Sequence, residues 1–168
     1  MLPCDLCHSE TEILTNQTYH YLECGLDNVY LEAIETRVCK SCGATTARIP
    51  RITHLHNTIA LAITLKDTPL SAKEVRFLRK RLNFKLSEWA KLLRVADTTL
   101  SKWENGEREI GSQSDSLIRL LYLQIFQERE GKLIDDPISS KLAFIKEMPT
   151  NNKLIIIVTP SITYRFAA

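Results

Sequence analysis

Two groups of residues in this chain have types and spacings that could do chemistry. The first is a pair of cysteine motifs, Cys4-x-x-Cys7 and Cys39-x-x-Cys42, with 31 residues between them. Two such motifs can place four thiolates tetrahedrally around Zn2+. The second is the stretch from Ala96 to Gly106, ADTTLSKWENG, which carries small hydrogen-bonding side chains at helical spacing. The first group predicts a metal site, and the second has the form needed to read a DNA major groove.

The cysteine set predicts a structural metal site. Four thiolates complete a tetrahedral coordination shell and leave no position for a reactive water, so a hydrolytic site is disfavoured. An iron site and a dithiol redox pair remain rival interpretations of the same residues. His8 follows the first motif where Gly43 follows the second, and we expect it to be a turn residue. The fifth cysteine, Cys24, is interpreted as a half-buried strand residue.

The stretch ADTTLSKWENG predicts a short helix that begins near Asp97. Leu100 and Trp103 lie one turn apart on one side of it, and Gly106 can end it in the left-handed conformation. The polar side chains repeat at i, i+3, i+4 and i+7 on the other side: Thr98, Ser101, Lys102 and Asn105. The helix is therefore expected to pack through its back and to present polar groups in front.

Charge is distributed unevenly along the 168 residues. Residues 1–50 carry 3 basic and 7 acidic side chains, a net charge of −4, whereas residues 71–110 carry 10 basic and 6 acidic, a net charge of +4. A polyanion would be attracted to the second segment. No apolar run approaches the ~20 residues of a membrane span, and the N-terminus lacks a signal-peptide pattern. We expect a cytoplasmic protein with no membrane contact.

These patterns predict an α+β chain in four parts. Residues 1–50 form a small β-rich, zinc-ribbon-like module, and residues 51–70 a helical connector and linker. Residues 71–130 form an all-α helix-turn-helix domain, and residues 131–168 a C-terminal extension with a short helix and a β tail. In the first module we expect a hairpin of strands 17–24 and 29–34, with further extended pieces at 36–38 and 45–49.

Helix signals are clearest after residue 70. Ser71 and Glu74 form a capping box, and Asn83 can end that helix in the left-handed conformation. A second helix runs to about Leu93, and a last helix from Gln113 to about Glu130 offers the expected dimer surface. In the extension, the β-branched run at 154–158 must pair with its own hairpin, with the metal module or with a second subunit.

The run from Phe77 to Gly106 resembles, without gaps, the helix-turn-helix of phage-repressor-like (XRE-type) regulators. Together with the pattern CxxC...CxxCG, residues 1–130 look like the MqsA family of zinc-ribbon/helix-turn-helix antitoxins. The resemblance implies a buried ion pair between Arg79 and Glu104. It also implies a set of DNA-binding positions, with the first four at base edges, the fifth at a phosphate and the last just beyond it: Asp97, Thr98, Thr99, Lys102, Asn105 and Arg108.

Three positions depart from the pattern of these regulators. Leu86 stands where a polar residue normally meets a phosphate, and Arg94 replaces the glycine of the turn. Ala96 replaces the small polar helix cap, so Asp97 is expected to cap the helix instead. We therefore give Thr98, Thr99 and Lys102 more weight than Asp97 as DNA contacts.

The resemblance and the residues together predict a transcriptional repressor that binds operator DNA as a homodimer. A structural Zn2+ would hold the N-terminal module, which the resemblance assigns to contact with a toxin protein. The alternative is a free-standing metal-responsive or other regulator that has no toxin partner. We do not expect an enzyme, because the sequence offers no clustered carboxylates, no Cys/His or Ser/His pair at useful spacing and no phosphate-cradling glycine loop.

Overall fold

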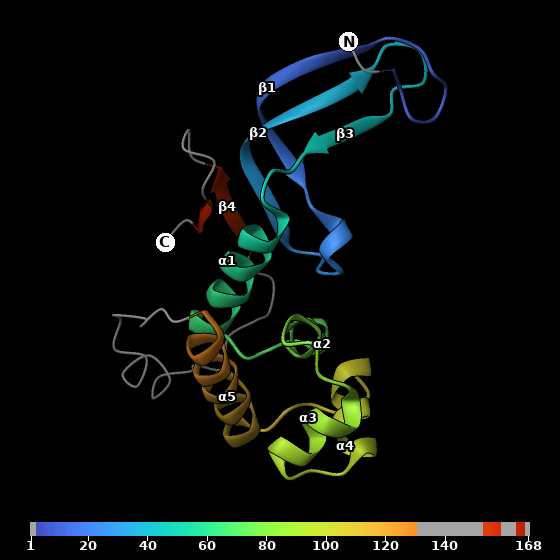
Figure 1. The fold of residues 1–168 in the computed structure, drawn as a ribbon. Coiled ribbons are helices and arrows are strands. Elements are labelled where there is room, and N and C mark those ends of the chain that lie inside the picture. Colours follow the sequence, from blue (N-terminus) through green and yellow to red (C-terminus); the bar gives the residue numbers. More distant parts are fainter. Residues whose placement is uncertain (1–2, 131–152, 159–163, 167–168) are drawn as a thin grey trace. The chain divides into compact units, whose positions relative to one another are not determined.

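The computed structural model describes residues 3–130, 153–158 and 164–166. These residues fall into two compact units. The first unit contains residues 3–23 and 27–58 together with the two C-terminal strands, and the second contains residues 24–26 and 59–130. The first unit holds the β-sheet, and most of the helical residues belong to the second, so the fold is α+β as the sequence predicted (Figure 1).

The first unit is built on a long antiparallel hairpin of β1 (Thr11–His20) and β2 (Val29–Cys39). The predicted strand at 17–24 was wrong in its bounds. Residues Leu22–Cys24 form a short 3-10 helix, because the amide of Tyr21 donates to the carbonyl of Val29 at 2.9 Å and closes the ladder there. Both strands extend toward the cysteines, and Thr11 faces Cys39, so the hairpin ends where the second cysteine motif begins.

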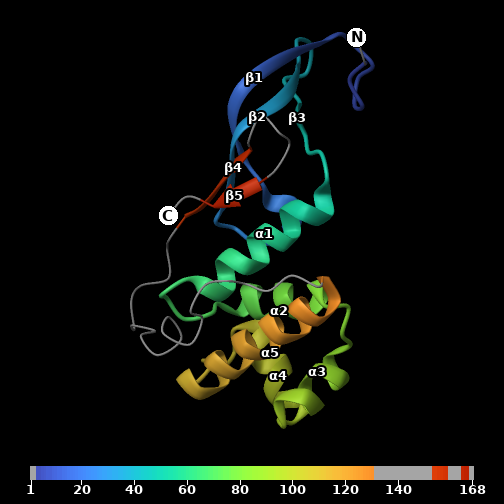
Figure 2. The ribbon, with the colours of Figure 1, turned by 60° about the vertical axis from the view of Figure 1, so that its left-hand side comes forward.

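Strand β2 is the centre of the sheet. Its C-terminal half pairs antiparallel with β3 (Thr45–Arg48), and its N-terminal half pairs parallel with β4 (Leu154–Val158). Strand β5 (Tyr164–Phe166) pairs antiparallel with β4 (Figure 2). The β-branched run near the C-terminus thus pairs both with its own hairpin and with the metal module. The short helix predicted in the C-terminal extension, where Ile138, Leu142 and Ile145 follow helical spacing, lies outside the described residues.

The helices follow the predicted ranges closely. The connector helix is α1 (Ile52–Leu65), and the helix-turn-helix region contains α2 (Ala72–Arg81), α3 (Leu86–Leu93) and α4 (Asp97–Asn105), followed by α5 (Ser112–Glu130). The capping box is present, with the Ser71 hydroxyl accepting from the amide of Glu74 and the Glu74 carboxylate accepting from the amide of Ser71. Side chains from all four later helices form the core: Val75, Leu78, Leu82, Trp89, Leu93, Leu100, Trp103, Ile118 and Tyr122.

One buried arginine, Arg119, joins α5 to the end of α1 and the segment that follows it. The side chain of Arg119 on α5 is 1% exposed and donates to the Asp115 carboxylate at 2.6 Å. Its remaining N–H groups donate to backbone carbonyls at the end of α1 and just after it: Ile63, Thr64, Lys66 and Thr68. The other Asp115 oxygen accepts from the amide of Leu70 at 2.6 Å. Helix α1 has no basic residue in its own last turn, so Arg119 satisfies the carbonyls that its C-terminus leaves unpaired.

We predict that Arg119→Met destabilises the second unit by about 3–5 kcal/mol, because it leaves the buried Asp115 carboxylate without its cation. Urea unfolding followed by tryptophan fluorescence measures this unit alone, since both tryptophans, Trp89 and Trp103, lie in its core. The matched control on the same helix is Gln124→Ala, which removes only an exposed hydrogen bond to Glu128 and should change stability by less than about 0.5 kcal/mol. Equal effects of the two changes would contradict the prediction.

Candidate functional site

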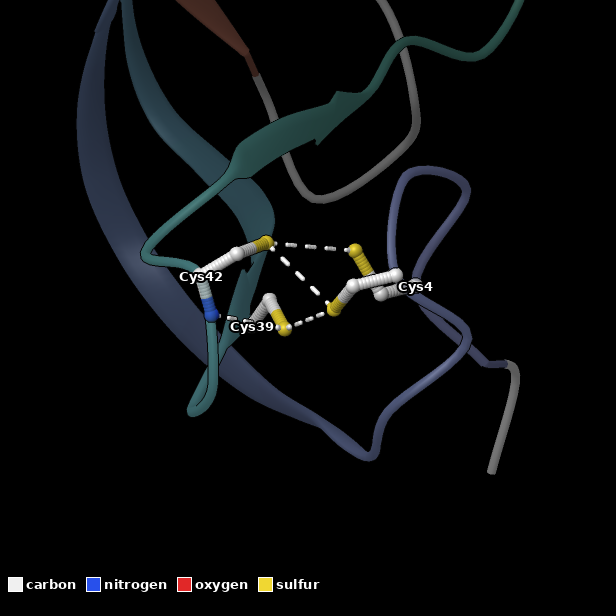
Figure 3. Close-up of side chains that lie close together, drawn as sticks. Cys4, Cys39 and Cys42 are labelled. Carbon is white, nitrogen blue, oxygen red and sulfur yellow. Dashed lines mark hydrogen bonds between the residues drawn. The ribbon is translucent and has the colours of Figure 1, made fainter.

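The four cysteines of the two motifs come together in the first unit (Figure 3). Their sulfur atoms all lie within 4.8 Å of one another, with Cys7 Sγ 3.4 Å from Cys39 Sγ and Cys4 Sγ 3.7 Å from Cys42 Sγ. Tetrahedral thiolates at a Zn–S distance of about 2.3 Å stand about 3.8 Å apart, so the observed spacing fits one metal ion. All four thiols are free, and their separations are well beyond the ~2.05 Å of a disulfide.

Backbone amides of both motifs point at the sulfurs. The amide of Leu6 lies 3.4 Å from Cys4 Sγ, and the amide of Ser41 lies at the same distance from Cys39 Sγ. Hydrogen bonds of this kind favour the charged thiolate over the neutral thiol. The two motifs therefore form equivalent turns, each prepared to hold an anionic ligand.

The residue after each motif closes its turn. His8 and Gly43 have φ angles of 59° and 72°, and each donates its amide to the carbonyl of the first cysteine of its motif at 3.0 Å. The expectation that His8 is a turn residue agrees with this conformation, and His8 is not part of the cysteine cluster. A left-handed residue is needed at both places, and glycine supplies it without strain only at the second.

The thiols of the cluster influence one another strongly. Hydrogen bonds from the hydroxyl and the backbone of Ser9 lower the pKa of Cys7 to about 6. The backbone of Ala44 also favours the thiolate of Cys42, but its sulfur contacts with Cys7 and Cys39 raise the pKa of Cys42 to about 12. Four thiolates this close repel one another, and a divalent cation removes that repulsion and allows all four to ionise. The arrangement therefore favours a bound metal ion.

Helix α4 is packed as the sequence predicted. Leu100 and Trp103 are buried on its back, while Thr98 and Lys102 are exposed one turn apart. Thr99 is half-buried beside them. The other predicted DNA contacts, Asp97 at the start of the helix, Asn105 at its end and Arg108 beyond it, are all exposed.

The expectation that Asp97 caps α4 was wrong. The helix takes Ala96 as its N-cap, because the carbonyl of Ala96 accepts from the amides of Thr99 and Leu100 at 2.9 and 3.1 Å. Asp97 is therefore the first residue inside the helix, where a carboxylate is favoured by the helix dipole but cannot act as the N-cap. Its side chain is exposed at the N-terminal end of α4 and is not withdrawn from the predicted DNA contacts by capping.

The turn between α3 and α4 tolerates its missing glycine. Arg94 has a φ angle of 55° and a ψ angle of 40°, the left-handed conformation that the resemblance to XRE-type regulators implies for this position. The next amide, that of Val95, donates to the carbonyl of Ala90 at 3.0 Å and ends α3. Leu86, the first residue of α3, is half-buried and offers no polar group where a phosphate contact was in doubt.

A buried ion pair ties α2 to the end of α4. Arg79 donates to both carboxylate oxygens of Glu104, at 2.6 and 2.7 Å, and these hydrogen bonds raise the pKa of Arg79. Arg79 also donates to the carbonyl of Phe84 at 2.9 Å, before the start of α3. The ion pair implied by the resemblance is thus present, and it fixes all three helices of the motif relative to one another.

A second arginine on α2 belongs to the same site, and the sequence did not reveal it. Arg76 donates to the side-chain oxygen of Asn105 at 2.6 Å, and its Nε lies 3.5 Å from the Glu104 carboxylate. Helical periodicity by itself indicates only an exposed position for Arg76 on α2, which agrees with its exposure. Its partners are 28 and 29 residues away in the chain, and no local pattern signals a contact at that separation.

Comparison with known proteins identifies one segment of the chain. Residues 75–113 match the family model described as Helix-turn-helix, and this segment runs from within α2 through α3 and α4 to the start of α5. No curated protein and no solved structure matches the chain. Among the described residues, no helix is long and apolar enough to cross a membrane. The match supports an XRE-type helix-turn-helix and a DNA-binding transcriptional regulator.

We predict that Cys39→Ser abolishes stoichiometric metal binding, because it removes one of four thiolates. The matched control is Cys24→Ser, since Cys24 lies outside the cluster in the short 3-10 helix. Elemental analysis of the purified full-length proteins would identify zinc or iron, and the absorption of a Co2+-substituted sample would report thiolate ligation. Tryptophan fluorescence should be unchanged in both variants. Full metal content in Cys39→Ser, or its loss in Cys24→Ser, would contradict the assignment.

Proposed function

We propose that the chain is a sequence-specific transcriptional repressor that reads an operator with α4. The single observation that carries this proposal is the presentation of that helix. Its back is buried through Leu100 and Trp103, its end is anchored by the Arg79–Glu104 ion pair, and its front carries Thr98 and Lys102. A helix that is rigidly held from behind and polar in front can enter a major groove without reorganising.

Each exposed residue has a chemical role in this proposal. Lys102 can donate to the O6 and N7 acceptors of guanine, and the hydroxyl and methyl groups of Thr98 and Thr99 can meet base edges and thymine methyls. Asn105 and Arg108 at the end of the helix contact phosphates. Asp97 has less weight, because a carboxylate repels phosphates and only cytosine among the bases presents it with a suitable donor.

We assign the metal site a structural role, and the metal is zinc in this proposal. Four thiolates close the coordination sphere, and binding of the ion stabilises a module whose own core is small. The chain is not an enzyme in this proposal, because no coordination position is left for a substrate or water. The module instead presents a folded surface to a protein partner.

The partner we propose is a basic toxin protein, which makes the chain the antitoxin of a toxin-antitoxin pair. The resemblance of residues 1–130 to the MqsA family supports this role. The charge of the metal module also supports it, because its acidic residues are mostly exposed and would attract a basic protein: Asp5, Glu10, Glu12, Glu23 and Asp27. Two of its few basic side chains, Lys40 and Arg48, already face acidic neighbours within the module.

A homodimer is part of the same proposal. Leu117 and Leu120 on α5 are 39% and 49% exposed, one turn apart on a helix whose other face lies in the core. An exposed leucine pair at this spacing suits packing against the same helix of a second copy. The dimer would bind a palindromic operator whose half-sites lie about one helical turn apart.

We predict that Lys102→Ala weakens operator binding by about 1–3 kcal/mol and relaxes the preference for operator over unrelated DNA, because a base contact is lost. The operator is first isolated with the wild-type protein from a pool of random duplexes, and affinities are then measured by fluorescence anisotropy at fixed salt concentration.

The control for this measurement is Lys91→Ala, which removes an exposed lysine of α3 and therefore the same charge. That variant should bind operator and unrelated DNA with an unchanged ratio of affinities. An unaltered ratio in the Lys102 variant would count against its base-reading role.

We predict further that the small basic protein encoded by a neighbouring open reading frame is captured by the metal module through its acidic surface. Glu10→Lys, an exposed change in the first unit, should weaken capture, whereas Glu109→Lys, an exposed change in the second unit, should not. The readout is co-purification with the full-length chain, together with relief of growth arrest on co-expression. If no neighbouring product is captured and chelation of the metal changes operator affinity, the alternative of a metal-responsive regulator replaces the antitoxin role.

A further inference from the structure

Two arginines, Arg76 and Arg79, face the single carboxylate of Glu104 at the end of α4. Glu104 is the only carboxylate that Arg76 and Arg79 share among the described residues, and its side chain is 2% exposed. Arg79 occupies both of its oxygens and is 12% exposed, whereas Arg76 is 45% exposed. One carboxylate neutralises one guanidinium, so the charge that remains uncompensated resides on the exposed arginine.

Two contacts from the α4 side hold the Arg76 guanidinium in place. Its Nη2 donates to Asn105 Oδ1 at 2.6 Å, and its Nε faces the Glu104 carboxylate at 3.5 Å. A guanidinium has five N–H donors, so these contacts leave donors without a partner among the described residues. A long side chain that is already positioned loses less conformational entropy when it binds an anion than a freely rotating one.

The same hydrogen bond orients Asn105. Because its Oδ1 accepts from Arg76, the amide of Asn105 is left to act as a donor through Nδ2, whose contact with Glu107 is long at 3.4 Å. An amide N–H and a guanidinium then stand side by side at the C-terminal end of α4. Both groups are exposed donors and one is charged, so two oxygens of one phosphate can accept hydrogen bonds from them.

From these contacts we infer that Arg76 is a phosphate-binding residue, which engages, together with Asn105, one backbone phosphate of the DNA duplex at the end of the recognition helix. This inference rests on the proposed DNA-binding function and adds a residue from α2 to the interface. The guanidinium binds without regard to base sequence, so Arg76 contributes to affinity and to the placement of α4 in the groove. It does not contribute directly to base discrimination.

The test uses the full-length, metal-loaded protein and two probes, a duplex selected by the wild-type protein from a random pool and a scrambled duplex of the same length and composition. Dissociation constants are measured from about 50 to 300 mM KCl. Arg76→Ala should make the negative slope of log affinity against log salt shallower by about 0.9 for each protomer bound, because one fewer phosphate is neutralised. It should weaken binding to both duplexes by the same factor, roughly fivefold near 150 mM salt for each protomer bound.

Two further variants separate charge from structure. Arg76→Lys retains the charge and should keep the wild-type salt slope. Arg76→Gln retains a donor for Asn105 but not the charge, so its slope should be as shallow as that of Arg76→Ala. Arg48→Ala removes an exposed arginine of the first unit and should leave the slope unchanged. Thermal unfolding followed by tryptophan fluorescence should give similar midpoints for all variants, because Arg76 is substantially exposed.

A neutral methylphosphonate placed at one backbone position at a time locates the contact. At one position in each half-site, the substitution should weaken the wild-type protein but have no further effect on Arg76→Ala. An unchanged salt slope in Arg76→Ala, a loss confined to the selected duplex, or an equal loss in Arg48→Ala would overturn the assignment while leaving DNA binding intact. Failure of the wild-type protein to select any duplex would instead overturn the proposed function and this inference together.

Discussion

The buried carboxylate of Glu104 is the group on which the geometry of the helix-turn-helix depends. It is buried at the end of α4 and accepts two hydrogen bonds from Arg79, which also donates a third to the carbonyl of Phe84. Helices as short as α3 and α4 are not stable by themselves, so their geometry must come from tertiary contacts. A bidentate ion pair fixes distance and angle together, which an apolar contact does less sharply.

In the metal module, the local geometry is set by the four cysteines and not by an ion pair. Its sheet joins segments more than 100 residues apart in the chain, and the four cysteines meet where the β1–β2 hairpin ends. Because Thr11 pairs with Cys39, the register of the β1–β2 hairpin also sets the position of the Cys39 thiol. In both units a charged or ionisable centre, and not the volume of the core alone, determines the local geometry.

These centres have consequences for function because they leave neighbouring groups free to act. Arg79 satisfies Glu104, so the guanidinium of Arg76 keeps its charge and can serve a partner. Likewise, the four cysteines suffice to hold one metal ion, so the exposed acidic residues of the module are not needed as its ligands. The Arg119–Asp115 pair satisfies carbonyls at the end of α1 and thereby joins that end of the connector to the helical domain. The sequence predicted a helical connector and linker here but did not indicate this contact.

The sequence by itself determined what is local or strongly patterned: the capping box at Ser71, the helix ranges, the packed back of α4 and the pairing of the cysteine motifs. Periodicity and spacing carry these features because the groups involved are close in the chain. The tertiary structure decided the rest, including the partner of β4, the N-cap at Ala96, the role of Arg119 and the place of Arg76 beside Asn105. Each of these depends on groups brought together across many residues, or on competition between neighbouring caps, and such choices are made by packing and not by local preference.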